Sequence, residues 1–397
     1  MSADAVSGGP SPGFGRLLAA LVASQVGLHA AMTGLRMAAP LDALARGATP
    51  WRVGVLLALF AAAPVLLAMT AGRLADRWGF HRPVHIAGGL CCAGLLLAAV
   101  SAAFQGWPAG ALLAAGAVAA GAGANIGLIA VQRTGGLTAR DPVERVRVFS
   151  WLGIAPSLAN VIGPVTVGLL IDAAGFGVAY AALLVLPLAS LLAARAVPVA
   201  AAPGRARDGG SAPLGELFAL PGMKRLLAVN WLLSMCWDVH SFAVPILGHE
   251  RGFSATTIGL VLGSFTLSVT GVRVLIPLLA RHLQPARVVA GAMLGTALIF
   301  AVYPLVTQPW LMGACAVALG VTLGCVQPML MTVLHHLTPE DRHGQALAFR
   351  SMTINGSSTV MPLLFGAAGA AIGAASMFWI VGALVGSGAW LARRLRA

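Results

Sequence analysis

The chain has 397 residues, of which 58% are hydrophobic and only 9% are charged. Its mean hydropathy is +0.88. A soluble globular protein carries roughly 25% charged residues, and a soluble surface as apolar as this one would aggregate. The composition therefore excludes that class and indicates an integral membrane protein.

The formal net charge is +13, from 25 Lys and Arg against 12 Asp and Glu. A basic excess can indicate nucleic-acid binding, but the chain has neither a basic helix nor an aromatic stacking surface. Basic cytoplasmic loops of a membrane protein explain the charge better. The five cysteines lie in apolar stretches without a CxxC pair, so no metal or redox site is predicted.

The first half of the chain predicts a short tail followed by six membrane spans. Residues 1–15 are polar, and the apolar run after them is too long for a cleavable signal, so we expect a cytoplasmic tail. A spanning helix needs about 20 mainly apolar residues. This length criterion predicts a six-helix bundle over 16–196, with spans at 16–39, 51–71, 83–104, 108–131, 148–171 and 177–196.

A break in hydropathy separates the two halves of the chain. Residues 197–223 are rich in Pro, Gly and Arg, which is typical of a linker. A second bundle is predicted over 224–391, followed by a tail at 392–397. Its six spans lie at 224–247, 255–280, 286–306, 309–334, 345–369 and 372–391.

Arginines are distributed unevenly between the two sides of the predicted membrane. One side holds Arg46, Arg52 and Arg251. The side with both termini holds the other arginines of the loops and tails, among them Arg73, Arg133, Arg140, Arg145, Arg147, Arg195, Arg205, Arg207, Arg281, Arg287, Arg342, Arg393, Arg394 and Arg396. Because basic residues mark cytoplasmic loops, both termini are predicted to be cytoplasmic, in the inner membrane of a bacterium.

The two halves also repeat short stretches of sequence. Residues Pro40-Leu41, Arg46-Gly47 and Gly54 recur as Pro245-Ile246, Arg251-Gly252 and Gly259, offset by 205. Leu137-Thr138 and Phe149 recur as Leu337-Thr338 and Phe349, offset by 200. Two offsets this similar indicate that the second six spans duplicate the first six in the same orientation. Parallel repeats of this kind occur in transporters, with the substrate site between them.

Residues 72–82, between the second and third spans, read GRLADRWGFHR. This segment resembles the signature G-x-L-a-D-R-x-G-r-[RK] of the major facilitator superfamily, and the resemblance extends over the twelve spans, the repeat and the central linker. It implies an all-α membrane fold of two parallel six-helix bundles. It also implies a cytoplasmic gating role, as a latch between the halves, for Gly72, Asp76, Arg77, Gly79 and Arg82. Phe80 departs from the signature, where the family prefers a basic residue.

The fifth span holds Gly153, Gly163, Pro164 and Gly168. These residues partly match the family's antiporter motif, which implies close approach of the fifth and eighth spans and favours an exporter. Ordinary packing of small residues is the alternative. In the fourth span, Ala117 stands where drug–proton antiporters of the family usually carry an arginine, which argues against a standard multidrug mechanism.

Ionisable side chains at the centre of the bilayer cost at least ~2.5 kcal/mol each, so each one is a functional candidate. Asp238 lies near the middle of the seventh span with His240 beside it, and its counterpart in the repeat is Thr33. Because the duplicated scaffold does not require this acid, we expect Asp238, with His240, to bind substrate or exchange a proton. A structural ion pair with Arg273 is the alternative.

Several other polar residues in the spans are candidates for contact with the substrate. A guanidinium group suits a carboxylate or phosphate, so Arg273 and Arg36 are candidates for an anionic substrate group. Arg36 and Arg350 lie near span ends and could instead reach the membrane interface. His29, Gln327 and Asn355 are further candidates, with packing as the alternative for His29.

The sequence thus predicts a monomeric secondary transporter that moves a small organic solute by alternating access. Protons are the expected coupling ion, because the chain lacks the phosphate-binding motif of nucleotide-driven pumps. Export of an anionic metabolite, siderophore or drug is the first interpretation, proton-coupled uptake the second, and a non-transporting sensor or scaffold a minor third. A cytoplasmic loop holds His335, His336 and His343 close to Glu340 and Asp341, but the repeat gives this segment a structural origin. No enzyme activity, cofactor, metal or nucleic-acid partner is therefore predicted.

Overall fold

The computed structural model describes residues 12–138, 142–198, 218–279, 284–339 and 343–395. The first eleven residues of the predicted N-terminal tail, most of the predicted linker, and Arg140, Arg281 and Arg342 lie outside these ranges. Within them the regular structure is entirely helical.

The N-terminal half comprises α1 (Pro12–Ala45), α2 (Pro50–Trp78), α3 (His81–Ser101), α4 (Trp107–Thr138), α5 (Pro142–Leu183) and α6 (Val185–Ala194). The C-terminal half comprises α8 (Met223–Glu250), α9 (Ala255–Leu279), α10 (Pro285–Val302), the 3-10 turn η2 (Tyr303–Leu305), α11 (Pro309–Gly324), α12 (Val326–Leu337), α13 (His343–Ile372) and α14 (Ala374–Arg393). Most helices extend past the predicted spans, because helical hydrogen bonding continues beyond the apolar stretch.

Three interruptions explain how these helices correspond to the predicted spans. Gly175 has φ 80° and reverses the chain within α5, so that α5 contains the fifth span and the start of the sixth. The sixth span is then broken after Leu183, and the tenth after Gly324. In a helix, the carbonyl groups of Leu183 and Gly324 would accept the N–H of the residue four positions later. Those residues are Pro187 and Pro328, which have no N–H to donate. The spans predicted at 177–196 and 309–334 are therefore present, but each consists of two consecutive helices where one was expected.

Nine segments of the described ranges are long and apolar enough to cross a membrane. One of them, residues 148–194, contains the reversal at Gly175 and thus holds two spans. The helices α8 and α13, of 28 and 30 residues, are also long enough, and they carry the polar residues Asp238 and Arg350. Together these elements form two six-helix halves, as predicted.

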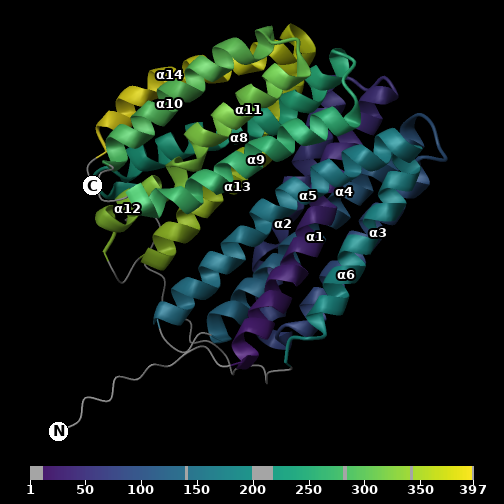
Figure 1. The fold of residues 1–397 in the computed structure, drawn as a ribbon, viewed down its shortest axis with the longest axis horizontal. Helices are drawn as coiled ribbons and strands as arrows, with labels where there is room; N and C mark the ends of the chain where they lie inside the picture. Colours follow the sequence, from purple (N-terminus) through teal and green to yellow (C-terminus); the bar gives the residue numbers. More distant parts are fainter. Residues whose placement is uncertain (1–11, 139–141, 199–217, 280–283, 340–342, 396–397) are drawn as a thin grey trace.

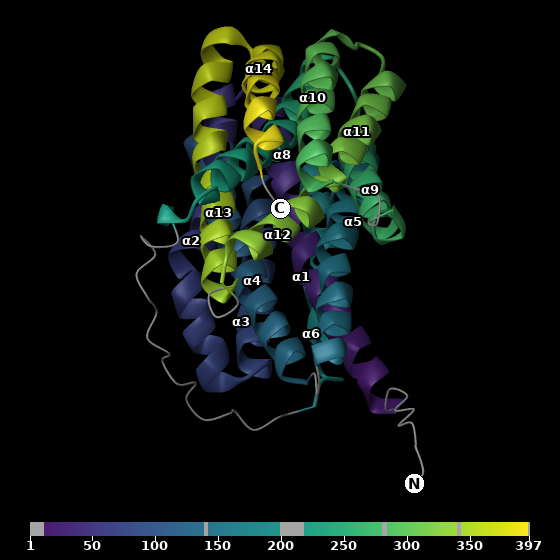
Figure 2. The same ribbon diagram turned by 90° about the vertical axis from the view of Figure 1, so that its left-hand side faces the viewer.

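Each half packs mainly on itself, and the halves meet along two helix pairs. Figures 1 and 2 show α5 beside α9 and α2 beside α13. In Figure 1, α3 and α6 lie on the outer side of the N-terminal half, and α10 and α14 lie on the outer side of the C-terminal half. We call the end of the molecule near the α2–α3 turn the Asp76 end, and the opposite end the Asp172 end. The halves converge toward the Asp172 end (Figure 1).

Glycines permit this convergence. Gly168 of α5 lies against the backbone of Ala255, and Gly259 of α9 lies against the backbone of Pro164. In the second pair, Gly54 of α2 lies against Pro362 of α13. A Cβ atom at any of these glycines would overlap backbone atoms of the other half. Small residues at helix crossings allow such close approach, so the two halves form a tight seal near the Asp172 end.

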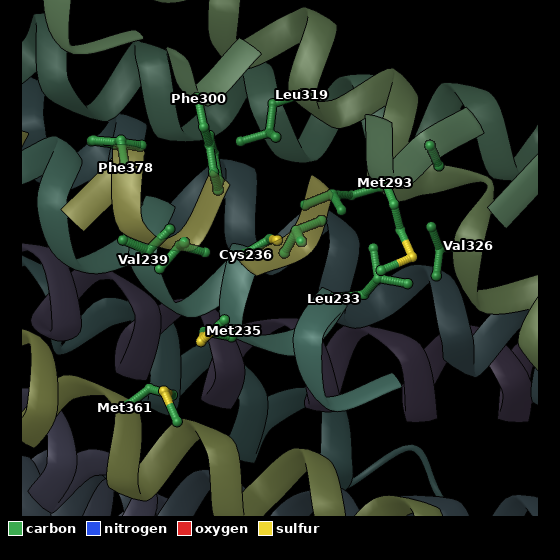
Figure 3. Packing of buried hydrophobic residues seen from close by; sticks show 14 of the residues in the cluster. Leu233, Met235, Cys236, Val239, Met293, Phe300, Leu319, Val326, Met361 and Phe378 are labelled. Carbon is green, nitrogen blue, oxygen red and sulfur yellow. The ribbon is translucent and has the colours of Figure 1, made fainter. Parts of the chain in front are cut away.

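The largest buried apolar cluster of the described residues lies mainly in the C-terminal half, and Val53 and Leu57 of α2 also belong to it (Figure 3). Phe300 of α10 and Phe378 of α14 meet edge to face, with ring centroids 5.2 Å apart. Cys236 and Val239 of α8 belong to the same cluster. This packing fixes the rotation of α8, and Trp237 and Asp238 lie on the side of α8 that borders the space between the two halves.

Candidate functional site

A cavity of about 290 Å³ lies between the two halves near the middle of the helices. The N-terminal half contributes Arg36 of α1 and Ser157 and Asn160 of α5. The C-terminal half contributes residues of α8, α9, α12 and α13, among them Asn230, Trp237, Asp238, Thr266, Arg273, Gln327 and Ser358. Four of the eight residues proposed from the sequence as substrate or coupling candidates thus line one space: Arg36, Asp238, Arg273 and Gln327.

Asp238 is held in the cavity wall by two hydroxyl groups of α13. Its side chain is 3% exposed. Ser357 Oγ donates to Oδ2 at 2.7 Å, and Ser358 Oγ donates to Oδ1 at 3.0 Å. Within the described part of the chain neither Asp238 nor Arg273 takes part in an ion pair, so the predicted alternative of a structural pair between them does not hold in this conformation. Within the described residues, the carboxyl group therefore faces the cavity without a cation in ion-pair contact.

Two guanidinium groups face the same cavity from opposite halves. Arg36 lies on α1 and Arg273 on α9, and each has a buried Nε atom with no hydrogen-bond partner. Buried polar atoms usually have a partner. Among the described residues that line the cavity, these two cations and Asp238 are the charged groups, so the site carries an excess of positive charge.

Arg350 lies at the edge of this cavity and is largely buried. Its Nε donates to Asn230 Oδ1 at 3.1 Å, and its Nη2 donates to Gln327 Oε1. Both acceptors line the cavity. Arg350 therefore does not extend to the membrane interface. It fixes the orientation of two polar cavity residues.

The three remaining candidates lie elsewhere. His240 is fully buried and lines a smaller adjoining cavity, where its Nε2 lies 3.2 Å from the Tyr303 hydroxyl. His29 is half-buried on α1, two turns before Arg36. Asn355 is exposed on α13. Neither His29 nor Asn355 is among the described residues that line these two cavities.

The signature residues cluster at the Asp76 end. Asp76 Oδ1 accepts a hydrogen bond from Arg133 Nε of α4 at 2.6 Å, a contact within the N-terminal half. Arg77 and Arg82 lie over the Trp78 ring at 5.8 and 5.7 Å from its centroid. Gly79 has φ 68° and makes the turn into α3, whereas a Cβ at Gly72 would meet no atom. The Asp76–Arg133 pair thus does not itself join the halves in this conformation.

The glycines of the fifth span have different neighbours. Gly163 packs on Ala30 and Gly34 of α1, in its own half. Pro164 and Gly168 pack on α9 of the other half, as the resemblance implied for the fifth and eighth spans. Gly153 lies in open space. Within this motif, the close approach between the halves therefore depends on Pro164 and Gly168 and not on Gly153 or Gly163.

Sequence reasoning missed the hydroxyl groups in the site. Ser157, Thr266, Ser357 and Ser358 line the cavity or bind Asp238. Serine and threonine are frequent in apolar helices, where they bond to the preceding turn, so no pattern in the sequence distinguished these four. Their spacing relative to Asp238 becomes visible only when α8 and α13 are placed side by side.

Comparisons with known proteins identify the family of this chain. The sequence profile described as Major Facilitator Superfamily matches residues 21–306 and 226–397. The tetracycline resistance protein, class C, of Escherichia coli is 28% identical over 83% of each chain. The enterobactin exporter EntS of Escherichia coli O1:K1 is 26% identical over 85% of this chain and 80% of the exporter.

Solved structures show the same fold at low sequence identity. A D-xylose-proton symporter superposes with a TM-score of 0.75 at 13% identity, over 96% of this chain and 98% of the symporter. An inward-facing bacterial homologue of the lysosomal transporter Spinster superposes with a TM-score of 0.74 at 12% identity, over 98% of each chain. The profile covers most of the chain and the predicted fold is confirmed, so this protein belongs to the Major Facilitator Superfamily of transporters.

Proposed function

We propose that this transporter exports a small organic anion across the inner membrane of a bacterium by alternating access. The observation that carries the proposal is the pair Arg36 and Arg273, which face one central cavity from opposite halves with buried, unpartnered Nε atoms. A guanidinium group binds carboxylate or phosphate through two parallel hydrogen bonds. An anion bound between these two arginines would contact both halves, as alternating access around a central site requires.

Protons are the proposed coupling ion, and Asp238 the proposed carrier. Its carboxyl group is buried, faces the cavity and receives hydrogen bonds from neutral hydroxyl groups only. An ionisable group in this setting inside a membrane is expected to take part in ion or proton movement. Proton entry on Asp238 would then alternate with substrate binding at the arginines.

Export is favoured over uptake by one relative and by one structural feature. The relative named as an enterobactin exporter is similar over most of both chains. The contact of Pro164 and Gly168 with α9 reproduces part of the motif that is typical of antiporters in this family.

We further propose that both termini are cytoplasmic, because arginines concentrate at the Asp76 end. With this orientation, the end at which the two halves are further apart faces the cytoplasm. We also propose that the protein acts as a monomer.

A thermal-shift series on detergent-purified protein at two pH values tests the substrate class. The probes are organic carboxylates, siderophores and lipophilic cations. A ligand at 100 times its Kd stabilises the folded state by about 2.7 kcal/mol. Stabilisation by anions that disappears in Arg273→Ala supports the proposal. Stabilisation by cations that disappears in Asp238→Asn would contradict the anionic class.

Reconstitution into vesicles tests direction and coupling. With a pH gradient imposed, the radiolabelled anion should leave the compartment that corresponds to the cytoplasm while protons enter it. The Asp238→Asn variant should bind the anion but lose the dependence on the gradient. Accumulation in the opposite direction would establish uptake, and the absence of movement for every stabilising probe would favour a non-transporting sensor.

A further inference from the structure

A second cavity, of about 60 Å³, adjoins the main one on its Asp172 side. The two share Arg36, Asn160, Trp237 and Thr266. On α8 the lining moves from Asn230–Asp238 to Trp237–Pro245, and on α9 from Thr266–Arg273 to Leu262–Thr266. Both shifts lead toward the Asp172 end. The small cavity is therefore the part of the central space nearest the Asp172 end. It lies next to the close contact between Pro164 of α5 and Gly259 of α9.

Among the described residues, three polar ones line the small cavity but not the main one, namely Thr33, His240 and Ser241, and His240 is the ionisable one of the three. The side chain is fully buried, and its Nε2 lies 3.2 Å from the Tyr303 hydroxyl. Its Nδ1 is buried and has no partner. When the Tyr303 hydroxyl donates to Nε2, the single proton of a neutral imidazole lies on Nδ1. His240 then offers one free N–H donor.

Arg36 offers a second free donor to the same cavity, since its buried Nε also has no partner. When Tyr303 donates to Nε2, two unpartnered donors therefore belong to residues around one small space, which indicates that an acceptor group belongs between them. The volume limits the size of that group. A water molecule needs roughly 10–15 Å³ of such volume, so about 60 Å³ is space for a few water molecules and admits a small group such as a carboxylate.

We propose that the small cavity is the subsite for one terminal carboxylate of the substrate, bound by His240 Nδ1–H and by Arg36. The remainder of the substrate occupies the main cavity, between Asp238 and Arg273. The inference rests on the proposed function and narrows it to organic acids with a carboxylate at one end of a larger body. Because Arg36 and His240 belong to different halves, the bound carboxylate joins the halves next to the seal.

The test measures binding of 3-phenylpropanoate and of its neutral analogue 3-phenylpropanamide to the full chain in detergent by isothermal titration calorimetry. Hydrogen bonds to charged groups contribute about 1.5–3 kcal/mol, which corresponds to about tenfold or more in affinity. The unmodified protein should therefore bind the carboxylate at least about tenfold more tightly than the amide.

Two conservative variants separate binding by His240 from a packing role. His240→Asn keeps an amide group at the position of Nδ1, and His240→Gln places its amide near Nε2, where it can still bind Tyr303. Carboxylate affinity should persist within about threefold in His240→Asn and fall about tenfold or more in His240→Gln. The affinity for the amide should change little in either. The reverse order would show that His240 acts through Tyr303, and would overturn the inference.

A ligand series on the unmodified protein tests the subsite without any variant. The corresponding sulfonate has a bulkier, tetrahedral head with three oxygen atoms. It should bind at least about tenfold more weakly than the carboxylate if the two donors of this small cavity are placed for a planar group with two oxygen atoms. Equal affinity for the carboxylate, the sulfonate and the amide would mean that water alone fills this cavity. Binding that depends on Arg273 but not on His240 overturns the subsite and leaves the proposed function standing. If no organic anion binds the unmodified protein, both are overturned.

Discussion

The Asp172 carboxylate of α5 accepts a hydrogen bond from the backbone N–H of Thr256, in the first turn of α9, at 2.8 Å. Its other oxygen accepts the N–H of Ala255 at 3.0 Å. The first N–H groups of a helix have no partner within the helix, and a carboxylate is favoured at this end of the helix dipole. A side chain of the N-terminal half thus caps a helix of the C-terminal half, and this contact must break when the Asp172 end opens.

Removal of this cap should favour opening at the Asp172 end. The loss of a capping side chain costs about 1 kcal/mol, so Asp172→Ala should raise the ratio of open to closed molecules roughly fivefold. Asp172→Asn keeps a capping oxygen and should change the ratio less. Spin labels in place of the exposed residues Phe104 and Trp310, in a cysteine-free background, report the distance between the halves. An unchanged distance distribution in Asp172→Ala would show that the cap does not hold this end closed.

The seal should also depend on Gly168. A Cβ atom there would lie 2.5 Å from the carbonyl oxygen of Ala255, so Gly168→Ala should push α5 and α9 apart at a cost of about 1–3 kcal/mol. We expect a longer distance between the same spin labels and slower transport.

Gly153→Ala is the matched control for this change, because Gly153 lies on the same helix in open space. It should leave the distance distribution and the transport rate unchanged. If the two alanine variants behave alike, the helix propensity of alanine explains both results and the steric argument fails.

Much of the fold could be predicted from the sequence, because its main determinants are local. Apolar length identifies a spanning helix, and the repeat around Arg46 and Arg251 identifies the duplication. The structure shows what the repeat preserves: Arg46 donates to the carbonyl of Phe104, and Arg251 donates to the carbonyl of Pro304. The breaks before Pro187 and Pro328 were missed because proline is common in membrane helices, where neighbouring groups often tolerate it without a break.

The site could be predicted less completely, because it depends on helix rotation. Asp238, Arg36 and Arg273 were identifiable as costly charges in apolar segments. Their placement around one cavity depends on packing such as that of Cys236 and Val239, which turns α8 inward. In a segment that is apolar on all faces, periodicity does not show which face lines a cavity.

The gating role proposed for Asp76 should affect transport far more than stability. Asp76 is 65% exposed in its pair with Arg133, and exposed ion pairs contribute at most about 1 kcal/mol. Asp76→Asn should therefore shift the melting temperature by only about 2 °C or less. If Asp76 latches the halves when the Asp76 end closes, the same variant should lose most of its transport in vesicles. Normal transport with this substitution would leave Asp76 as a residue that sets topology only.

Asp42, Arg46 and Tyr180 form a polar cluster at the Asp172 end. A substitution in this cluster should affect stability strongly, in contrast to one at Asp76. Asp42 is 2% exposed, and it accepts hydrogen bonds from Arg46 Nε at 2.6 Å and from the Tyr180 hydroxyl at 3.1 Å. Removal of one partner from a buried ion pair costs about 3–5 kcal/mol, reduced here because Arg46 is 29% exposed. Asp42→Asn should therefore lower the melting temperature markedly.

Tyr180→Phe is the matched comparison for Asp42→Asn, because it removes one neutral donor and leaves the ion pair intact. A neutral hydrogen bond contributes about 1 kcal/mol, so this variant should lower the melting temperature by clearly less. Thermal unfolding of both variants in the same detergent gives the order directly. Leu247, the counterpart of Asp42 in the repeat, shows that the C-terminal half holds Arg251 without an acid. Equal losses in the two variants would therefore mean that Arg46, like Arg251, is held mainly by backbone carbonyl groups.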